Sequence, residues 1–314
     1  MAASKYVGLY LQVKKIKFMF QKKFAFFSNP LSVFLFAFSF FIISCNSGEK
    51  KPTPQEDSIA AKKKADSIFV ANGGFISAPF TYDPSKRYIY LTWDDGPQPP
   101  GTNICKKVFE DLGVKATFFM VGMHAFDGSR MAIVDSIRNS YPQFLLANHS
   151  YSHAFRDKYT TFYTHPDSAV NDFLKTQEMF KVPVKIIRLP GNSAWVNDHQ
   201  VKSAKSVRAV CERLDSLGYN VFGWDIEWRF KNQGGSVPVQ SVDQMLKEVN
   251  DAYENRIAVN TPNNVVILAH DRMFAKPNYT DSLIKFVSTL KKDPRYVFET
   301  LDHYPGVKNI QQSK

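Results

Sequence analysis

The sequence is poor in cysteine, with three residues in 314, at positions 45, 105 and 211. None of them belongs to a Cys-x-x-Cys pair, which argues against a thiolate zinc site. Cys105 and Cys211 lie far apart in helix-like stretches, so the sequence allows either two buried thiols or one disulfide.

The chain also has few long apolar runs. The apolar segment 31–44 is shorter than the about 20 residues of a spanning helix. It follows a lysine-rich stretch, as in a signal peptide, and residues 42–45 (Ile-Ile-Ser-Cys) resemble a bacterial lipobox. We therefore expect 1–44 to be a signal peptide and Cys45 to carry a lipid that anchors the exported protein in the cell envelope. An uncleaved membrane anchor is the alternative, and Met19 is an alternative start.

Acidic residues are absent from residues 1–44, which hold six lysines. Much of the formal net charge of +11 therefore belongs to this segment, and the rest of the chain is only mildly basic. No basic run interleaved with aromatic residues follows residue 70. This distribution argues against a nucleic-acid partner.

Beyond the leader, the pattern divides the chain into a polar, proline-containing tether (45–68), a transition segment without a predicted structure (69–86), a regular body (87–305) and a tail (306–314). Seven strand-like runs lie at 88–93, 116–122, 144–148, 184–189, 220–225, 265–269 and 296–301. Helix-like stretches lie at 103–112, 129–138, 168–180, 199–217, 242–253 and 281–290. This alternation predicts an α/β fold, a distorted or incomplete (β/α) barrel with about seven parallel strands. A doubly wound open sheet is the second choice.

Polar residues follow the predicted strands at their carboxyl ends. These residues are Asp94, Asp95, His149, Arg188, Asp225 and His270. Because the carboxyl ends of parallel strands share one rim, we expect these side chains to converge there.

Two motifs supply groups that suit a metal ion. His149 and His153 are four residues apart, which would place both imidazoles on one face of a helix. The segment Thr92-Trp-Asp-Asp-Gly-Pro97 offers two adjacent carboxylates, of which one can bind metal while the other faces a water molecule. Two histidines, one carboxylate and open positions are typical of catalytic zinc. Each motif alone favours a structural role, and only the two together favour a metal site.

The order of these motifs resembles the polysaccharide deacetylase family, carbohydrate esterase family 4 with the NodB-homology domain. The segment at 92–97 is similar to the family's Thr-Phe-Asp-Asp-Gly-Pro, and 149–153 matches its His-Ser/Thr-x-x-His. Residues 116–122 resemble the family's second strand, and the resemblance extends over about 87–305.

The resemblance implies a role for each polar residue. Asp95, His149 and His153 would bind a divalent metal, usually zinc, and Asp94 would be the general base. His270 would be the general acid that protonates the leaving amine. Arg188 would pair with Asp94 and keep it ionised, and Asp225 would pair with His270 and raise its pKa.

Two motifs depart from the family pattern. The third usually reads Arg-x-Pro-aromatic-Gly, whereas here Gly191 follows Pro190 and Trp195 comes later. In place of the fourth motif's Asp-Trp pair stands Glu227-Trp228. We expect Trp228, Pro190 and Trp195 to contact the substrate.

The expected function is metal-dependent removal of N-acetyl groups from a polysaccharide that contains N-acetylglucosamine, such as peptidoglycan, a chitin-like chain or an exopolysaccharide. The same residues would suit an O-acetyl esterase acting on xylan, or a metal-dependent amidase for small molecules with a closed pocket. An inactive surface carbohydrate-binding lipoprotein would lack the base, the acid or a ligand, and the sequence retains all of them.

Overall fold

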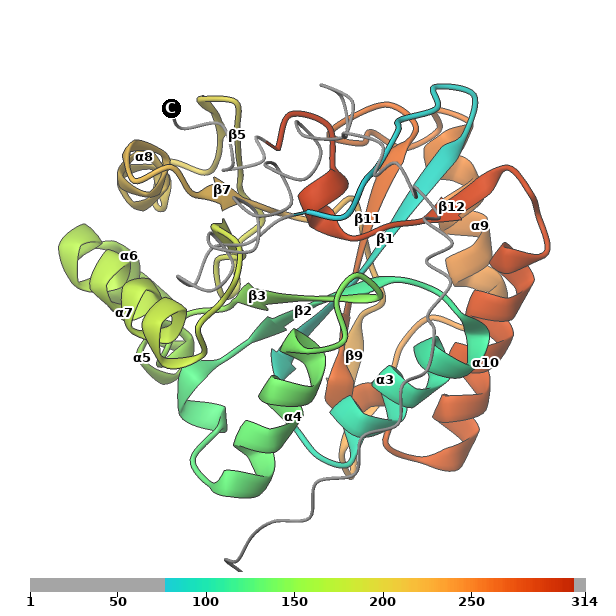
Figure 1. The fold of residues 1–314 in the computed structure, drawn as a ribbon, viewed down its shortest axis with the longest axis horizontal. Coiled ribbons are helices and arrows are strands. Elements are labelled where there is room, and N and C mark those ends of the chain that lie inside the picture. Colours follow the sequence, from blue (N-terminus) through green and yellow to red (C-terminus); the bar gives the residue numbers. More distant parts are fainter. Residues whose placement is uncertain (1–76, 308–314) are drawn as a thin grey trace, which may run out of the picture. The chain divides into compact units, whose positions relative to one another are not determined.

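The computed structural model describes residues 77–307, which form a mixed α/β fold built on a largely parallel sheet (Figure 1). The sheet has ten strands: β1 (Arg87–Gly96), β2 (Ala116–Met120), β3 (Phe144–Asn148), β4 (Ile186–Ile187), β5 (Trp195–Asn197), β6 (Gln200–Lys202), β7 (Asn220–Val221), β8 (Ile226–Glu227), β11 (Asn264–His270) and β12 (Tyr296–Phe298). Their order is β6-β5-β7-β4-β3-β2-β1-β11-β8, with β12 also paired to β1. The end strands β6 and β8 do not pair with each other, so within the described residues the barrel is incomplete. The predicted fold class is confirmed.

All seven predicted strands are present, but two of them are much shorter than expected. β4 and β7 contain two residues each, although the predicted strand-like runs span six residues each. β5 and β6 were not predicted as strands. They form an antiparallel pair, and β5 also runs antiparallel to β7.

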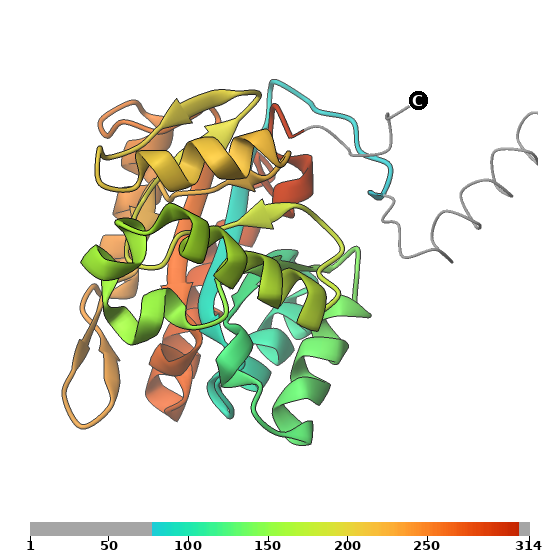
Figure 2. The same ribbon diagram turned by 90° about the vertical axis from the view of Figure 1, so that its left-hand side faces the viewer.

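The helices are α3 (Gly101–Leu112), α4 (Gly128–Arg138), α5 (His153–Asp157), α6 (Tyr159–Tyr163), α7 (Pro166–Met179), α8 (Arg208–Ser216), α9 (Val242–Tyr253) and α10 (Pro277–Lys291), with 3-10 turns η1 (Gly122–His124), η2 (Asp271–Phe274) and η3 (Leu301–His303). They lie around the outside of the central strands (Figures 1 and 2). α9 has the predicted bounds, because Ser241 and Gln244 form a capping box at its start.

The predicted helix at 199–217 is wrong in its first half. Asp198 and His199 both have positive φ, 48° and 62°, and turn the chain from β5 into β6. The helix α8 begins only at Arg208. Two consecutive residues in the left-handed region interrupt any helix that starts at position 199.

The strands at the centre of the sheet form a buried core. In β1, nine of the ten residues are buried, and Trp93 packs edge-on against Phe109 at 4.9 Å between ring centroids. β1 pairs with β11 over seven positions, from Tyr88 opposite Asn264 to Asp94 opposite His270. This register brings two predicted site residues, which are far apart in the sequence, to the same end of the sheet.

Two further features bear on the sequence predictions. Cys105 and Cys211 are both buried and free, so they are two thiols and not a disulfide. None of the helices within residues 77–307 is both long and apolar enough to span a membrane. The predicted signal peptide, the lipid anchor at Cys45 and the tether lie outside the described residues.

Candidate metal centre

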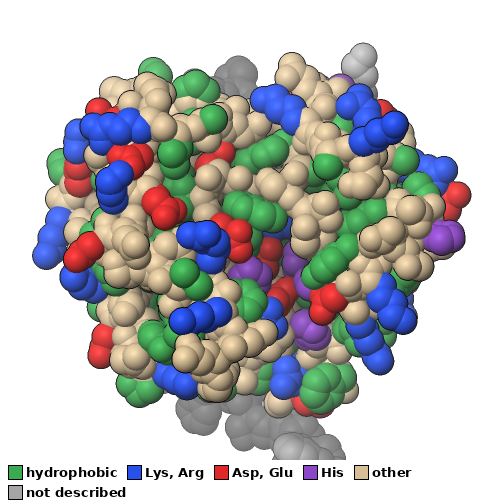
Figure 3. All heavy atoms as spheres, turned by 180° about the vertical axis from the view of Figure 1, so that it is seen from behind, with side chains coloured by type: hydrophobic (Ala, Val, Ile, Leu, Met, Phe, Trp, Pro, Cys, Tyr) green, Lys and Arg blue, Asp and Glu red, His purple; other side chains and the backbone are tan. Residues whose placement is uncertain are grey.

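A cavity of about 510 Å³ lies where β1, β3 and β11 end. Figure 3 shows histidine and acidic side chains gathered in this hollow on one face of the molecule. Five of the six predicted rim residues lie in or against it: Asp94, Asp95, His149 and His270 line the cavity, and Arg188 contacts Asp94 from behind. The convergence expected from the strand order is therefore present, with Asp225 as the exception.

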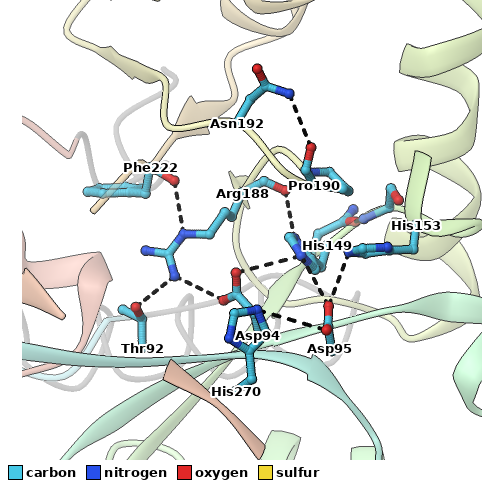
Figure 4. Close-up of polar contacts among 12 residues, drawn as sticks. Thr92, Asp94, Asp95, His149, His153, Arg188, Pro190, Asn192, Phe222 and His270 are labelled. Carbon is cyan, nitrogen blue, oxygen red and sulfur yellow. Dashed lines mark hydrogen bonds and ion pairs between the residues drawn. The ribbon is translucent and has the colours of Figure 1, made fainter. Parts of the chain in front are cut away.

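The two adjacent aspartates point in different directions because the chain bends between them. The register of β1 against β2 shifts between Asp94 and Gly96, and Asp95 has a φ of 72°. Asp94 turns its carboxylate toward Arg188, whereas Asp95 faces His149 and His153 (Figure 4). One carboxylate is thus directed to the two imidazoles and the other to a buried cation, as the sequence predicted.

His149 and His153 do not share a helix. His149 follows β3, residues 151–152 form a bend, and Ser150 has a φ of 69°. The element α5 that begins at His153 is a left-handed turn, with positive φ at every residue from 153 to 157. The rings nevertheless lie close, with 5.2 Å between centroids. The expected proximity is correct, but a turn produces it instead of helical spacing.

Hydrogen bonds fix which nitrogen of each ring faces the cavity. His149 Nδ1 lies 2.9 Å from the carbonyl oxygen of Arg188, and His153 Nδ1 lies 2.5 Å from Asp157 Oδ1. Both partners only accept hydrogen bonds, so each Nδ1 carries the proton. The opposite nitrogen of each ring, Nε2, faces Asp95 Oδ1, at 3.6 Å from His149 and 3.1 Å from His153.

These three side chains fit a divalent metal ion. One ligand atom from each of Asp95, His149 and His153 lies within 4.8 Å of the others. Asp95 Oδ1 is buried and makes no hydrogen bond, and such an atom needs a compensating partner. Histidines that bind a metal through one ring nitrogen usually donate a hydrogen bond through the other, as Nδ1 of His149 and Nδ1 of His153 do here.

The charges of Asp95 and His149 are compatible with this use, whereas the pKa of His153 is raised, because burial opposes its protonation but Asp95 and Asp157 outweigh that effect. Burial works against ionisation of Asp95, but His153, His270 and His149 hold its pKa below the usual range. Burial and the neighbouring His153 lower the pKa of His149 to about 3, so this ring is neutral at neutral pH. A metal-binding imidazole must be neutral.

Arg188 is fully buried behind Asp94 and has the predicted pairing. Its Nη1 donates to Asp94 Oδ1 at 2.9 Å and to Thr92 Oγ1 at 2.7 Å. Its other nitrogens donate to the carbonyls of Phe222 and Gly223. Burial nevertheless raises the pKa of Asp94, and Arg188 only opposes this shift. Burial therefore opposes the predicted effect of Arg188, which was to keep Asp94 ionised.

The predicted pairing of Asp225 with His270 is wrong. Asp225 accepts hydrogen bonds from the main-chain N–H groups of Asn260, at 2.7 Å, and Val266, at 2.8 Å. It therefore ties the chain beside β11 and does not reach the imidazole. His270 Nε2 lies 3.9 Å from Asp95 Oδ2, and the ring packs edge-on against Phe230. Burial lowers the pKa of His270, against the opposing effect of Asp95 and Asp94.

The three predicted substrate contacts do not line the cavity. Trp228 is fully buried, packs against Phe274 and Phe286, and donates through Nε1 to the carbonyl of Gln240 at 3.0 Å. Trp195 packs against Phe222 and Tyr304 away from the centre. Pro190 is buried between two lining residues, and its carbonyl accepts a hydrogen bond from Tyr163.

Replacement of Trp228 by Ala is expected to cost about 3–5 kcal/mol of folding stability, because it opens a cavity in the core. Metal affinity of the folded variant should stay unchanged, since Trp228 does not contact the three candidate ligands. Denaturant unfolding and a metal titration measure the two quantities. A stable variant that has lost only activity would instead place Trp228 in the substrate pocket.

The sequence analysis gave no individual role to several residues that line the cavity. They are Gln98, His124, Asp157, Tyr159, Leu189, Gly191, Trp224, Glu227, Phe230, Leu268 and Arg272. His124 follows β2 and bonds through Nδ1 to the carbonyl of Asp95 at 2.7 Å. The rule that polar residues at strand ends converge would have found it. Arg272 Nη2 lies 2.7 Å from Asp95 Oδ2, and its guanidinium lies 4.7 Å from the ring centroid of Phe230.

The chain is similar to several known proteins. Residues 81–210 match the polysaccharide deacetylase family model. This match supports a polysaccharide deacetylase domain in the chain, as the motifs predicted.

Curated relatives include a chitin disaccharide deacetylase of Vibrio alginolyticus, 23% identical over 72% of this chain and 73% of that protein. A peptidoglycan-N-acetylglucosamine deacetylase of Bacillus cereus is 23% identical over 66% of this chain and 84% of that protein. A Streptococcus mutans CE4 esterase has a similar fold, with a TM-score of 0.52 and 22% identity over 68% of this chain and 86% of that chain.

Proposed function

We propose that this protein is a zinc-dependent hydrolase that removes N-acetyl groups from a polysaccharide containing N-acetylglucosamine. The observation that carries the proposal is the convergence of Asp95, His149 and His153 beside a second carboxylate, Asp94, and a further imidazole, His270, in one cavity. Amide hydrolysis requires an activated water, a polarised carbonyl and an acid for the leaving amine. The cavity holds a group for each task.

Asp95, His149 and His153 are the proposed metal ligands. One carboxylate and two imidazoles with open positions are the ligand set of many catalytic zinc sites. When bound, the metal supplies Lewis acidity, which polarises the acetyl carbonyl and makes water more acidic. Asp95 brings one negative charge, and each imidazole would bind through Nε2, which requires that a proton on Nε2 of His153 is displaced.

Asp94 is the proposed general base. Arg188 holds Oδ1 of Asp94 at 2.9 Å, while Oδ2 lies 3.6 Å from His149 Nε2. The carboxylate is therefore fixed, with one oxygen directed to the ligand cluster, where it takes a proton from the attacking water.

His270 is the proposed general acid. Its Nε2 faces the carboxylate of Asp95, and Nδ1 is buried without a hydrogen-bond partner. Protonation of the leaving nitrogen at this position completes the hydrolysis, because an amine anion cannot leave. The products are acetate and the free amino sugar.

The cavity wall supports a sugar substrate. Tyr159, Trp224 and Phe230 line it together with Leu189 and Leu268. Such surfaces, with a few polar groups, are typical of ligand sites. The curated relatives that act on chitin disaccharide and on peptidoglycan N-acetylglucosamine support an N-acetylated glycan as substrate. The cavity opens on the surface in Figure 3, which fits a polymer better than a closed small-molecule site.

The proposed cellular location rests on the sequence of residues 1–45. We propose that the protein is exported and held on a bacterial membrane through a lipid at Cys45. The support is the lysine-rich start, the apolar run at 31–44 and the cysteine directly after it.

The proposal is tested by acetate release from chito-oligosaccharides, peptidoglycan fragments and acetylated xylan, with and without a chelator. We expect release from the first or second substrate class, loss of release with chelator and recovery with zinc. Release only from xylan would indicate an O-acetyl esterase. No release from any of the three would favour a carbohydrate-binding protein without activity.

A further inference from the structure

Each of the three candidate ligands is held from behind by a different group. The carbonyl oxygen of Arg188 accepts from His149 Nδ1, and Arg272 binds Asp95 Oδ2. His153 alone is held by a carboxylate, that of Asp157, at 2.5 Å. Asp157 also lines the cavity, and neither the sequence motifs nor the proposed reaction gives it a role.

The backbone conformation of residues 153–157 brings the side chains of His153 and Asp157 together. Residues 153 to 157 all have positive φ, between 49° and 66°, and none of them is glycine. The left-handed conformation is unfavourable for such residues and persists only where the surroundings enforce it. Main-chain bonds from Arg156 N to Ser152 O and from Lys158 N to Ala154 O close the turn, at 2.8 and 2.9 Å.

The turn is also anchored by side chains. Ser152 Oγ accepts from the N–H of Phe155 at 2.8 Å, and Phe155 packs edge-on against Phe162. The hydroxyl of Tyr159 donates to Asp157 Oδ1 at 3.0 Å, the same oxygen that His153 uses. The acceptor is therefore fixed from two directions.

We propose that Asp157 is a positioning residue for the metal ligand His153, and that the left-handed turn serves to deliver it. This inference rests on the proposed metal centre. The carboxylate keeps the proton on Nδ1, directs Nε2 toward Asp95 Oδ1 and makes the ring a stronger donor. Its negative charge also favours a bound cation, so orientation and charge act in the same direction.

The expected loss of metal affinity depends on how exposed the side chain of Asp157 is to solvent. Loss of a group behind a metal ligand usually costs about 10–100-fold in metal affinity. The side chain of Asp157 is 65% exposed, whereas that of His153 is 18% exposed. Water can replace part of the interaction, so we expect a loss near the lower end, about tenfold.

Two replacements test the role without disturbing the backbone. Asn and Gly both accept positive φ, so neither adds strain at the φ of 66° of Asp157. Asp157→Asn keeps the shape and an acceptor oxygen but removes the charge, whereas Asp157→Gly removes the side chain. Asp198→Asn is the matched control, because Asp198 is an exposed aspartate with a φ of 48° outside the cavity.

The measurement is the zinc dissociation constant of the metal-free proteins, obtained by competition with a chelator, together with their thermal unfolding. We expect affinity to fall about tenfold in Asp157→Gly and less in Asp157→Asn, with Asp198→Asn unchanged. The metal-free proteins should unfold at similar temperatures, while the stabilisation by zinc shrinks in the Asp157 variants.

Unchanged zinc affinity in both Asp157 variants would overturn the role of Asp157 and leave the proposed deacetylase function intact. A wild-type protein that binds no zinc would overturn the metal centre and, with it, this inference. Binding by the wild type without acetate release from any glycan would refute the proposed activity but not the role of Asp157.

Discussion

Asp94→Asn is expected to lower the turnover rate of acetate release by about 10²–10⁴-fold, the usual contribution of a general base. The amide keeps the size of the side chain and an oxygen that can accept from Arg188, but it cannot take a proton from water. Zinc content should remain, because Asp95, His149 and His153 hold the metal without Asp94. Turnover and metal content are measured on the same preparation.

The variant needs a folding control, because Arg188 is fully buried and loses its charged partner. An unpaired buried charge commonly costs about 3–5 kcal/mol. Thermal unfolding identifies that cost, and activity is then compared well below the melting temperature. Full activity in the folded Asp94→Asn protein would refute the assignment of Asp94 as the base.

Asp95→Ala is expected to remove the bound metal. The change deletes the only anionic ligand of the three, so affinity should fall by more than the roughly 10–100-fold that loss of an outer partner costs. Elemental analysis after dialysis should find zinc in the wild type and in Asp94→Asn, but not in Asp95→Ala. The two adjacent positions thus separate loss of the base from loss of the metal.

Asp95→Ala also frees Arg272, whose Nη2 now lies 2.7 Å from the carboxylate. Arg272 is partly exposed, so water can solvate it and a folded protein is expected. Chelator-sensitive activity and a full equivalent of zinc in Asp95→Ala would show that the metal binds elsewhere.

The sequence was sufficient to predict the rim of the sheet. Continuous apolar strands are buried on both faces, and parallel strands end on one side, so Asp94, His149 and His270 had to meet. The Asp-Asp step was also predictable, because two adjacent side chains at a strand end cannot point the same way. These inferences depend only on local pattern and strand direction.

The prediction that Trp228 contacts the substrate failed because a shift of one residue along a strand reverses the side that a side chain faces. Ile226 and Trp228 are buried in the core, whereas Glu227 between them lines the cavity. The alternation is that of a β-strand, in which neighbouring side chains face opposite sides. β8 contains only two residues, which are too few for an alternating pattern to be recognised in the sequence. Trp224, which precedes β8, lines the cavity, whereas Trp228 does not.

The hydrogen-bond partners of Asp225 and His153 could not be predicted from the sequence for a different reason. Asp225 binds main-chain N–H groups near residues 260 and 266, and the sequence does not mark such acceptor sites. The turn at 153–157 adopts a conformation that its residue types disfavour, so propensity predicts against it. Tertiary contacts determine both features.

The register of β1 and β11 separates the proposed reacting groups from the aromatic residues of the cavity wall. Asp94 and His270 occupy one rung, so main-chain hydrogen bonds fix the spacing of the proposed proton acceptor and donor. Phe230 belongs instead to the hairpin of β9 (Phe230–Asn232) and β10 (Ser236–Pro238), and Tyr159 to α6. The proposed reacting groups and these aromatic residues of the cavity wall therefore lie on separable parts of the chain. Exchange of the hairpin offers a route to re-target the protein while its proton-transfer pair stays in register.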